Sequence, residues 1–310
     1  MIRFGVAGYP PAFHESEYRK DRLNIVRWLA DLGLNAFELQ MTYGPRMSPE
    51  NCVRLRALAE ETNITLSVHG SYFIVFTSDD PDKIARSSDT LKRTYEAADK
   101  LGASVIVLHP GPLYGSVGRE PLERFITNAG ECLHQIGKTD IGLFVETAGK
   151  IGQLGSVDEI LAICESIDGT FPCIDFGHVH ARTLGTLEEP SAIDALVDRL
   201  CAFVGSRADA RIHFHYTPIH YGPRGEIQHR AIGDRYSAPA QKTLFGEHGP
   251  GEGSRDGFFH PRVEPVAAAL SRIPLDFTVV SETHDSQQEG ALALKLAAVP
   301  KRRPRVRSAA

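Results

Sequence analysis

The sequence predicts an α/β fold, namely a single-domain (β/α)8 (TIM) barrel with a long loop after the seventh strand. Two observations predict it. Eight short runs rich in Val, Ile, Leu and Phe recur along the 310 residues, and helical patterns lie between them. The runs are almost continuously apolar, which is typical of parallel strands covered on both faces, and eight such strands are the number that this barrel needs. The expected strands are Ile2–Gly8, Ala36–Met41, Thr65–His69, Ser104–His109, Gly142–Glu146, Pro172–Phe176, Arg211–Tyr216 and Asp276–Glu282.

Helix signals fill the intervening segments. Ser48 followed by Pro49 is a typical N-cap with proline at the first helical position. Ser156 with Glu159 forms a capping-box pattern before an apolar run. Leucine and valine recur at helical spacing over residues 23–32, and Gly33 then ends that helix. Helices are therefore expected between the strands, as this barrel requires.

One domain is expected over residues 1–298, followed by a basic tail over 299–310. No internal repeat or linker divides the chain. Thr217 to about Pro261 is expected to be one long loop, because it lacks a clear strand or helix pattern and ends in a glycine-rich stretch. Loops of this length inside compact domains are usually functional. Since it follows the seventh strand, it should lie over the C-terminal mouth of the barrel, where barrel active sites form.

The composition is that of an ordinary globular protein, with 42% hydrophobic and 24% charged residues. No run approaches 18 apolar residues, and no signal peptide is visible, so no membrane association is expected. Five cysteines without a CxxC pair favour reduced thiols and a cytoplasmic location. The net charge is −5 although the tail alone holds five Lys and Arg, so the charge does not by itself indicate a nucleic-acid partner.

The polar residues with catalytic chemistry collect where the strands end. Because the carboxyl ends of parallel strands meet at one mouth of the barrel, these side chains should converge. Imidazoles and carboxylates without thiolates are typical of a metal site, and burying so many of them without cations would be costly. More than four candidate ligands favour more than one metal. The strand ends supply His69, His109, Glu146, Asp175 with His178, His213 with His215, and Glu282.

His213 and His215 are two residues apart and point to the same face, so either could be the ligand of the seventh strand. Five other histidines are more plausible near the site than in it: His180, His220, His248, His260 and His284.

Five motifs, in order from about residue 60 to 285, resemble the endonuclease IV family of apurinic/apyrimidinic (AP) endonucleases, within the xylose isomerase-like barrels. His69-Gly-Ser-Tyr72-Phe73 is similar to the family's metal-binding His with its DNA-facing pair, and His109-Pro-Gly to its second His motif. Glu146-Thr-Ala-Gly resembles the bridging-glutamate motif. Asp175-Phe-Gly-His178 and Glu282 resemble the remaining two.

The resemblance implies three zinc ions, with Mn²⁺ or Mg²⁺ as alternatives. His69, His109 and Glu146 would hold the first. Glu146 would bridge to the second, which Asp175, His215 and Glu282 complete. His178 and His229 would hold the third, together with Glu226. The family has Asp-x-His at this last position, whereas this chain has Glu226-Ile-Gln-His229, one residue longer.

The activity that the resemblance implies is that of a hydrolase, a deoxyribonuclease IV-type phosphodiesterase that cuts DNA 5′ to abasic sites in base excision repair. A zinc-bound hydroxide would attack phosphorus, with Glu146 as the catalytic carboxylate. Tyr72 and Phe73 would wedge into the duplex, or else only anchor their loop. The partner would be double-stranded DNA with abasic sites, and a monomer is expected.

Two alternatives stay open. A sugar isomerase or epimerase on the same barrel would need one divalent metal, which Glu146, Asp175, His215 and Glu282 could hold alone. A metal-bearing barrel could also bind damaged DNA without cutting it. The sequence leaves accessory 3′-repair or exonuclease activities undecided.

Overall fold

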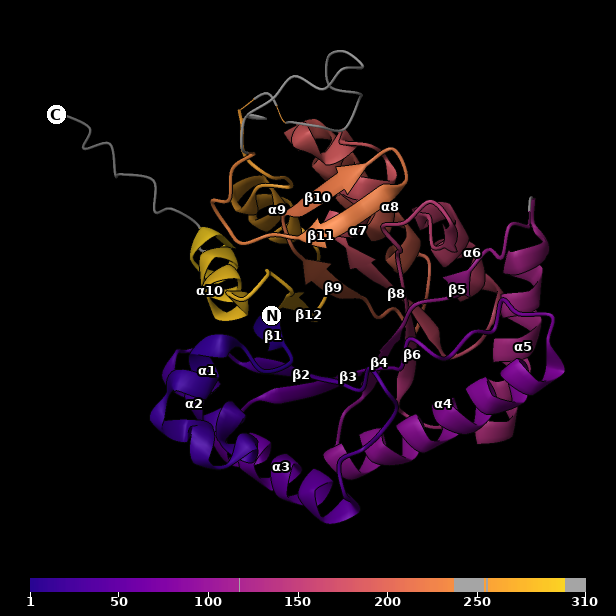
Figure 1. Ribbon diagram of the computed structural model, residues 1–310, viewed down its shortest axis with the longest axis horizontal. Helices are drawn as coiled ribbons and strands as arrows, with labels where there is room; N and C mark the ends of the chain where they lie inside the picture. Colours follow the sequence, from indigo (N-terminus) through magenta and orange to yellow (C-terminus); the bar gives the residue numbers. More distant parts are fainter. Residues whose placement is uncertain (117, 237–253, 255, 299–310) are drawn as a thin grey trace, which may run out of the picture.

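Eight parallel strands close into a barrel in the computed structural model, which describes residues 1–116, 118–236, 254 and 256–298 (Figure 1). Their order around the barrel is β1-β12-β9-β8-β6-β4-β3-β2, so the first strand pairs with the last. All eight expected strands are present, with ends shifted by two residues at most, and the predicted fold class is confirmed. The barrel strands are β1 (Ile2–Ala7), β2 (Ala36–Gln40), β3 (Thr65–His69), β4 (Val105–Leu108), β6 (Gly142–Glu146), β8 (Thr170–Asp175), β9 (His213–Tyr216) and β12 (Phe277–Ser281).

Helices surround the barrel, and their ends follow the expected signals. The Ser48 hydroxyl accepts a hydrogen bond from the Asn51 amide, and the capping box of Ser156 and Glu159 is complete. Gly33 adopts a φ of +75° just beyond the helix it was expected to end. The helices are α1 (Pro11–Glu15), α2 (Ile25–Asp31), α3 (Pro49–Thr62), α4 (Pro81–Leu101), α5 (Glu120–Ile136), α6 (Val157–Ser166), α7 (Phe176–Arg182), α8 (Pro190–Gly205), α9 (Val263–Leu270) and α10 (Gln287–Ala298), with 3₁₀ turns at Glu17–Lys20, Arg22–Asn24 and Thr186–Glu188.

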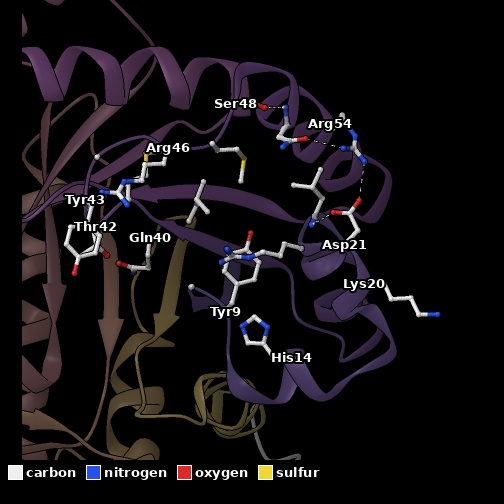
Figure 2. Close-up of a pocket in the computed structure, with 18 residues that line it drawn as sticks. Tyr9, His14, Lys20, Asp21, Gln40, Thr42, Tyr43, Arg46, Ser48 and Arg54 are labelled. Atoms are coloured by element: carbon white, nitrogen blue, oxygen red, sulfur yellow. Dashed lines mark hydrogen bonds and ion pairs between the residues drawn. The ribbon is translucent and has the colours of Figure 1, made fainter.

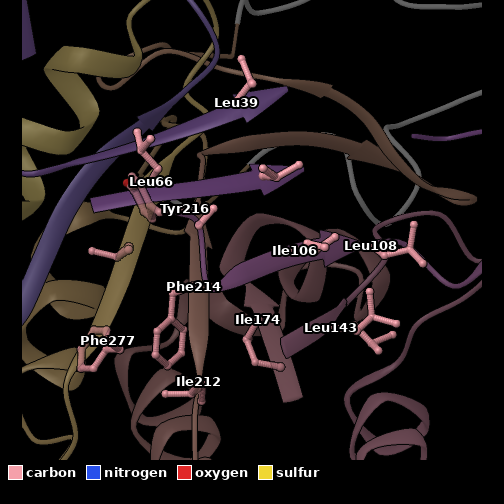
Figure 3. Packing of buried hydrophobic residues seen from close by; sticks show 14 of the residues in the cluster. Leu39, Leu66, Ile106, Leu108, Leu143, Ile174, Ile212, Phe214, Tyr216 and Phe277 are labelled. Carbon is pink, nitrogen blue, oxygen red and sulfur yellow. The ribbon is translucent and has the colours of Figure 1, made fainter. Parts of the chain in front are cut away.

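Alternate residues of the strands face opposite environments. Phe214 and Tyr216 of β9 belong to the large apolar cluster between strands and helices, where Phe214 also meets Phe277 of β12 (Figure 3). The alternate residues of β9, His213 and His215, reach Glu38 of β2 instead. Since β12 and β1 separate β9 from β2 in the barrel wall, this contact crosses the barrel interior. The interior is therefore polar near its C-terminal mouth.

The segment Thr217–Pro261 is not one continuous loop, and that expectation was wrong. It begins with an antiparallel hairpin of β10 (Ile219–Gly222) and β11 (Gly225–His229), which packs on α7 (Figure 1). Apolar Ile219 and Tyr221 are buried, which gives the hairpin a packed face. Residues 237–253 and 255, with His248 among them, and the basic tail 299–310 lie outside the described residues.

Gly225 fixes the hairpin to the rest of the barrel. It adopts a φ of +87°, and a Cβ there would overlap the carbonyl oxygen of Gly149. The Glu226 amide donates to that carbonyl at 3.0 Å, and the Ile151 amide donates to the Arg224 carbonyl at 3.1 Å. The loop after β6 thus holds the start of β11 against the barrel mouth. A second small pair, β5 (Gly111–Pro112) and β7 (Gln153–Leu154), lies nearby. No helix among the described residues is long and apolar enough to cross a membrane.

Candidate metal centre

Glu146 stands at the centre of the barrel mouth, where β6 ends, and it is completely buried. Its oxygen Oε2 lies 3.1 Å from Nε2 of His69 and 3.3 Å from Nε2 of His109. Its other oxygen, Oε1, lies 3.2 Å from Nδ1 of His178 and 3.1 Å from Nδ1 of His215. Four imidazoles from different parts of the mouth therefore surround one carboxylate. This is the arrangement expected of a bridging ligand.

Asp175 caps a helix with one carboxylate oxygen and leaves the other without a hydrogen bond to any residue that the structure describes. It is the N-cap of α7, and its Oδ1 accepts a hydrogen bond from the His178 amide at 2.8 Å. Its Oδ2 is buried and has no hydrogen-bond partner among the described residues. The carboxylate oxygens of Asp175, Glu146 and Glu282 and a nitrogen of His215 all lie within 4.8 Å of one another. An orphaned carboxylate oxygen in such a group fits a divalent cation.

A separate group forms where α7 meets the β10–β11 hairpin. Nε2 of His178 lies 3.4 Å from Nε2 of His229, and Glu226 lies 3.7 Å from the first and 3.5 Å from the second. Glu226 and His229 are one residue further apart than in the endonuclease IV pattern, yet both lie beside His178.

Main-chain carbonyls set the proton positions of three histidines. Nδ1 faces the Gly70 carbonyl at 3.0 Å in His69, the Thr147 carbonyl at 2.9 Å in His178 and the Glu282 carbonyl at 3.1 Å in His229. Because a carbonyl only accepts, each Nδ1 carries a proton, which leaves Nε2 as the nitrogen that could bind a metal. All three Nε2 atoms face carboxylates at the mouth. This is how ligand histidines are held in metal sites.

The structure thus brings all nine sequence-predicted ligand residues together at one mouth. It also places the two candidates of β9 differently, since His215 faces Glu146 whereas His213 lies deeper, 3.1 Å from Glu38. Of the other histidines, His180 stacks on His260 with ring centroids 6.0 Å apart, and neither belongs to a ligand group of the described residues. His220 and His284 belong to none of the groups at the mouth.

Glu38 is a buried carboxylate beside the site that sequence reasoning missed. It is completely buried in the middle of β2, and its Oε2 accepts hydrogen bonds from Ser67 at 2.9 Å and from His213 at 3.1 Å. Its Oε1 lies 3.0 Å from Nε2 of His215. The available signal was an acid between Phe37 and Leu39 in an otherwise apolar strand, two residues before Gln40.

In the metal-free protein, burial and the neighbouring charges shift the pKa values of these imidazoles and carboxylates. Burial lowers the pKa of His69, but the hydrogen bond and charge of Glu146 outweigh it and raise the pKa to about 9. Burial lowers the pKa of His109 to about 3. Burial would raise the pKa of Glu146, but the charges of His109 and His215 hold it well below its ordinary value. Burial raises the pKa of Glu282, and repulsion by Glu146 adds to it. Divalent cations would replace these protons, so the donor set fits metal.

Exposed aromatic side chains border the centre. The ring of Tyr72 stacks on His109, with centroids 5.5 Å apart, and Phe73 lies 5.9 Å from Tyr43. Tyr72 and Phe73 are 55% and 66% exposed. The Arg46 guanidinium lies 5.0 Å above the Tyr43 ring.

A cavity of about 910 Å³ opens between the ends of β1 and β2 and the start of α3 (Figure 2). Four cationic side chains line it, Lys20, Arg22, Arg46 and Arg54, of which Arg54 pairs with Asp21 at 3.1 Å. Gln40 lines the same cavity and donates to Glu282 at 3.4 Å. The cationic cavity and the carboxylate cluster are therefore neighbours.

Comparisons with known proteins agree with this architecture. A probable endonuclease 4 of Shouchella clausii is 27% identical over 164 residues, which cover 50% of this chain and 54% of that protein. An uncharacterized protein of Methanocaldococcus jannaschii, MJ0133, is 26% identical over 236 residues, or 76% of this chain and 83% of that one. The chain thus spans about half the length of the endonuclease 4 relative.

Solved structures share the fold. Endonuclease IV from Thermus thermophilus superposes with a TM-score of 0.61 at 20% identity, over 96% of this chain and 97% of that one. An L-ribulose 3-epimerase superposes with a TM-score of 0.64 at 15% identity, over 96% of both chains. The likeness to both enzymes therefore concerns the fold alone. The family model described as xylose isomerase-like TIM barrel matches residues 26–301, and the chain belongs to that family.

Proposed function

We propose that this protein is a metal-dependent endonuclease of the endonuclease IV type, which hydrolyses the phosphodiester 5′ to abasic sites in double-stranded DNA. The observation that carries the proposal is the separate group of His178, Glu226 and His229. It adds ligands well beyond the four that a single metal takes, and it faces the same mouth as Glu146. The resemblance to probable endonuclease 4 proteins supports the same activity.

Three metal positions are proposed, with zinc as the ion that best suits imidazole and carboxylate donors. His69, His109 and Glu146 would hold the first, and Glu146, Asp175, His215 and Glu282 the second. His178, Glu226 and His229 would hold the third. When bound, such ions lower the pKa of water towards neutrality and neutralise phosphate charge. Glu146 would offer Oε2 on the side of His69 and His109 and Oε1 on the side of His215. No side chain would need to act as a nucleophile.

The surroundings of the centre suit a nucleic acid. Lys20, Arg22 and Arg46 line the cavity next to Glu282 and would supply phosphate contacts to a chain that is otherwise acidic. The exposed rings of Tyr72 and Phe73 would enter the duplex beside the lesion. Extruding a nucleotide costs least where a base is already missing, which would favour abasic sites. The enzyme would then act in base excision repair.

A sugar epimerase is the second candidate. One observation favours it: Glu146, Asp175, His215 and Glu282 form a complete four-ligand group by themselves. A single metal there would leave the convergence of His178, Glu226 and His229 without a purpose. The endonuclease accounts for both groups.

The test is an incision assay on a duplex that carries one tetrahydrofuran abasic analogue. This analogue cannot undergo β-elimination, so a nick requires hydrolysis and leaves a 3′-hydroxyl and a 5′-phosphate. Protein purified without chelator should cut on the 5′ side, and Glu146→Gln should not. Glu131→Gln, an exposed acid on α5, is the matched control and should cut like the wild type. No cleavage by wild-type protein with all its metals bound would reject the endonuclease, and epimerisation of a ketohexose would then support the second candidate.

A further inference from the structure

Below the proposed metal positions, the barrel interior contains a second polar layer. It consists of Glu38 on β2, Ser67 on β3, and His213 and His215 on β9, all of them buried. A carboxylate in this position is costly unless it is paired and hydrogen-bonded. Glu38 accepts hydrogen bonds from Ser67 and His213 at its Oε2, whereas its Oε1 has no aligned hydrogen bond to any described residue.

The imidazole of His215 connects this layer to the metal centre. Its Nδ1 faces Oε1 of Glu146 at 3.1 Å and Oε1 of Glu282 at 3.6 Å, on the metal side. Its Nε2 points inward and lies 3.0 Å from Oε1 of Glu38. Neither of these two buried atoms has an aligned hydrogen-bond partner in the described part of the chain, so each is the partner available to the other.

His215 is oriented differently from the other ligand histidines. His69, His178 and His229 each place Nδ1 beside a main-chain carbonyl and turn Nε2 to the centre. His215 turns Nδ1 to the centre, so with a metal bound there its proton would sit on Nε2. Glu38 provides the acceptor that a main-chain carbonyl provides elsewhere.

We propose that Glu38 is a positioning residue for His215. It accepts the Nε2–H proton and so keeps the Nδ1 lone pair directed at the second metal position. Ser67 and His213 in turn hold Glu38, through the 2.9 Å and 3.1 Å hydrogen bonds to its Oε2. A carboxylate behind a ligand histidine fixes the ring orientation and raises the ligand's basicity. The inference rests on the metal binding proposed above, but not on DNA as the substrate.

Glu38, His213 and His215 also lie close enough to form a metal site themselves. The geometry favours the positioning role, because Oε2 of Glu38 is already used by two donors. A metal in this group would displace those bonds, and it would need His215 deprotonated at both nitrogens to serve two metals.

The test measures metal affinity without DNA, by competition between the protein and a chromophoric zinc chelator. We expect Glu38→Ala to weaken binding at one of the metal positions by about 10- to 100-fold. Glu38→Gln keeps a carbonyl oxygen for the Nε2–H and should restore most of the affinity. Ser67→Ala removes a donor to Glu38 but leaves the contact with His215, and it should have a smaller effect than Glu38→Ala. Thermal unfolding of each metal-free variant verifies that the barrel is folded.

Spectra of ¹⁵N-labelled histidine provide a readout that a purely structural role would not change. In the zinc-loaded protein, the Nε2 proton of His215 should be hydrogen-bonded in the wild type and in Glu38→Gln, and its resonance should shift upfield in Glu38→Ala, where the acceptor is missing. Unchanged zinc affinity in folded Glu38→Ala would overturn the proposal. So would an additional zinc per chain that is lost in His213→Ala, because it would make the layer a metal site. If these results hold but the abasic duplex stays uncut, only the proposed endonuclease activity fails.

Discussion

The phenol ring of Tyr72 lies flat against the imidazole of His109, with ring centroids 5.5 Å apart and an interplanar angle of 16°. An exposed side chain thus rests directly on a proposed metal ligand. Neighbouring Phe73 extends into solvent beside Tyr43. A base or sugar ring that enters between these side chains would be placed next to the metal centre.

The double variant Tyr72→Ala, Phe73→Ala should therefore bind abasic duplex more weakly. Stacking on aromatic residues contributes about 1–3 kcal/mol per base, so a loss of at least tenfold in affinity is expected. Fluorescence anisotropy with a labelled tetrahydrofuran duplex measures it. Tyr72→Phe keeps the ring and is the control. Unchanged affinity in the double variant, at equal metal content, would remove these residues from DNA recognition.

Gly225 should control the third metal position. Gly225→Ala places a Cβ against the Gly149 carbonyl and must displace β11, which carries Glu226 and His229. We expect zinc per chain to fall by one in elemental analysis while the barrel stays folded. Gly233→Ala is the matched control, because its φ of +85° carries similar strain but its Cβ meets open space. Equal zinc content in the two variants would contradict this role of the hairpin.

Metal binding should strengthen as the pH rises towards 9. In the metal-free protein the pKa of His69 is raised to about 9, so at neutral pH a proton occupies the nitrogen that the metal needs. Each pH unit below 9 should weaken zinc binding at that position by up to about tenfold, or about 1.4 kcal/mol. Above pH 9 this dependence should disappear.

Two variants separate the contributions to this pH dependence. His109 has a pKa lowered to about 3 by burial, so it is already neutral over this range. His69→Gln should bind zinc more weakly and lose part of the slope, whereas His109→Gln should bind more weakly and keep it. Competition titrations at pH 6, 7 and 8, corrected for chelator protonation, decide between them. If zinc binding depended equally on pH in both variants, the proton that zinc displaces would not be the one on His69.

The cationic cavity should determine how DNA binding depends on salt. Removing one phosphate contact reduces the slope of log affinity against log salt by about 0.9. We expect Lys20→Ala and Arg46→Ala each to reduce it by roughly this amount. Lys138 lies between α5 and β6, at the opposite end of the barrel from the cavity. Lys138→Ala should therefore leave the slope unchanged. Equal slopes in all three variants would mean that the DNA does not enter the cavity.

The barrel and most of the candidate site were predictable from the apolar strand pattern and from the residues at the strand ends. Apolar runs indicate buried parallel strands, and the carboxyl ends of such strands must meet at one mouth. His69, Glu146 and Glu282 follow directly from their positions at strand ends. His213 and His215 both point inward, so spacing alone could not choose between them, and His215 as the ligand stays a prediction.

Glu38 and the hairpin were harder to predict, for different physical reasons. The role of Glu38 depends on β9, which lies across the interior, and no local pattern in β2 reports such a distant partner. The hairpin strands are short, and only one face of them is buried, so their apolar pattern is weak. Glycines flank the turn at Gly222 and Gly225 and were the available signal.

Pairing of β1 with β12 has a consequence for biosynthesis. Glu282 follows β12, so this carboxylate can join Glu146 only after β12 has been synthesised and has paired with β1. A truncated product that ends before Phe277 would lack both β12 and this carboxylate. Occupation of the proposed metal centre should therefore depend on closure of the barrel by β1 and β12.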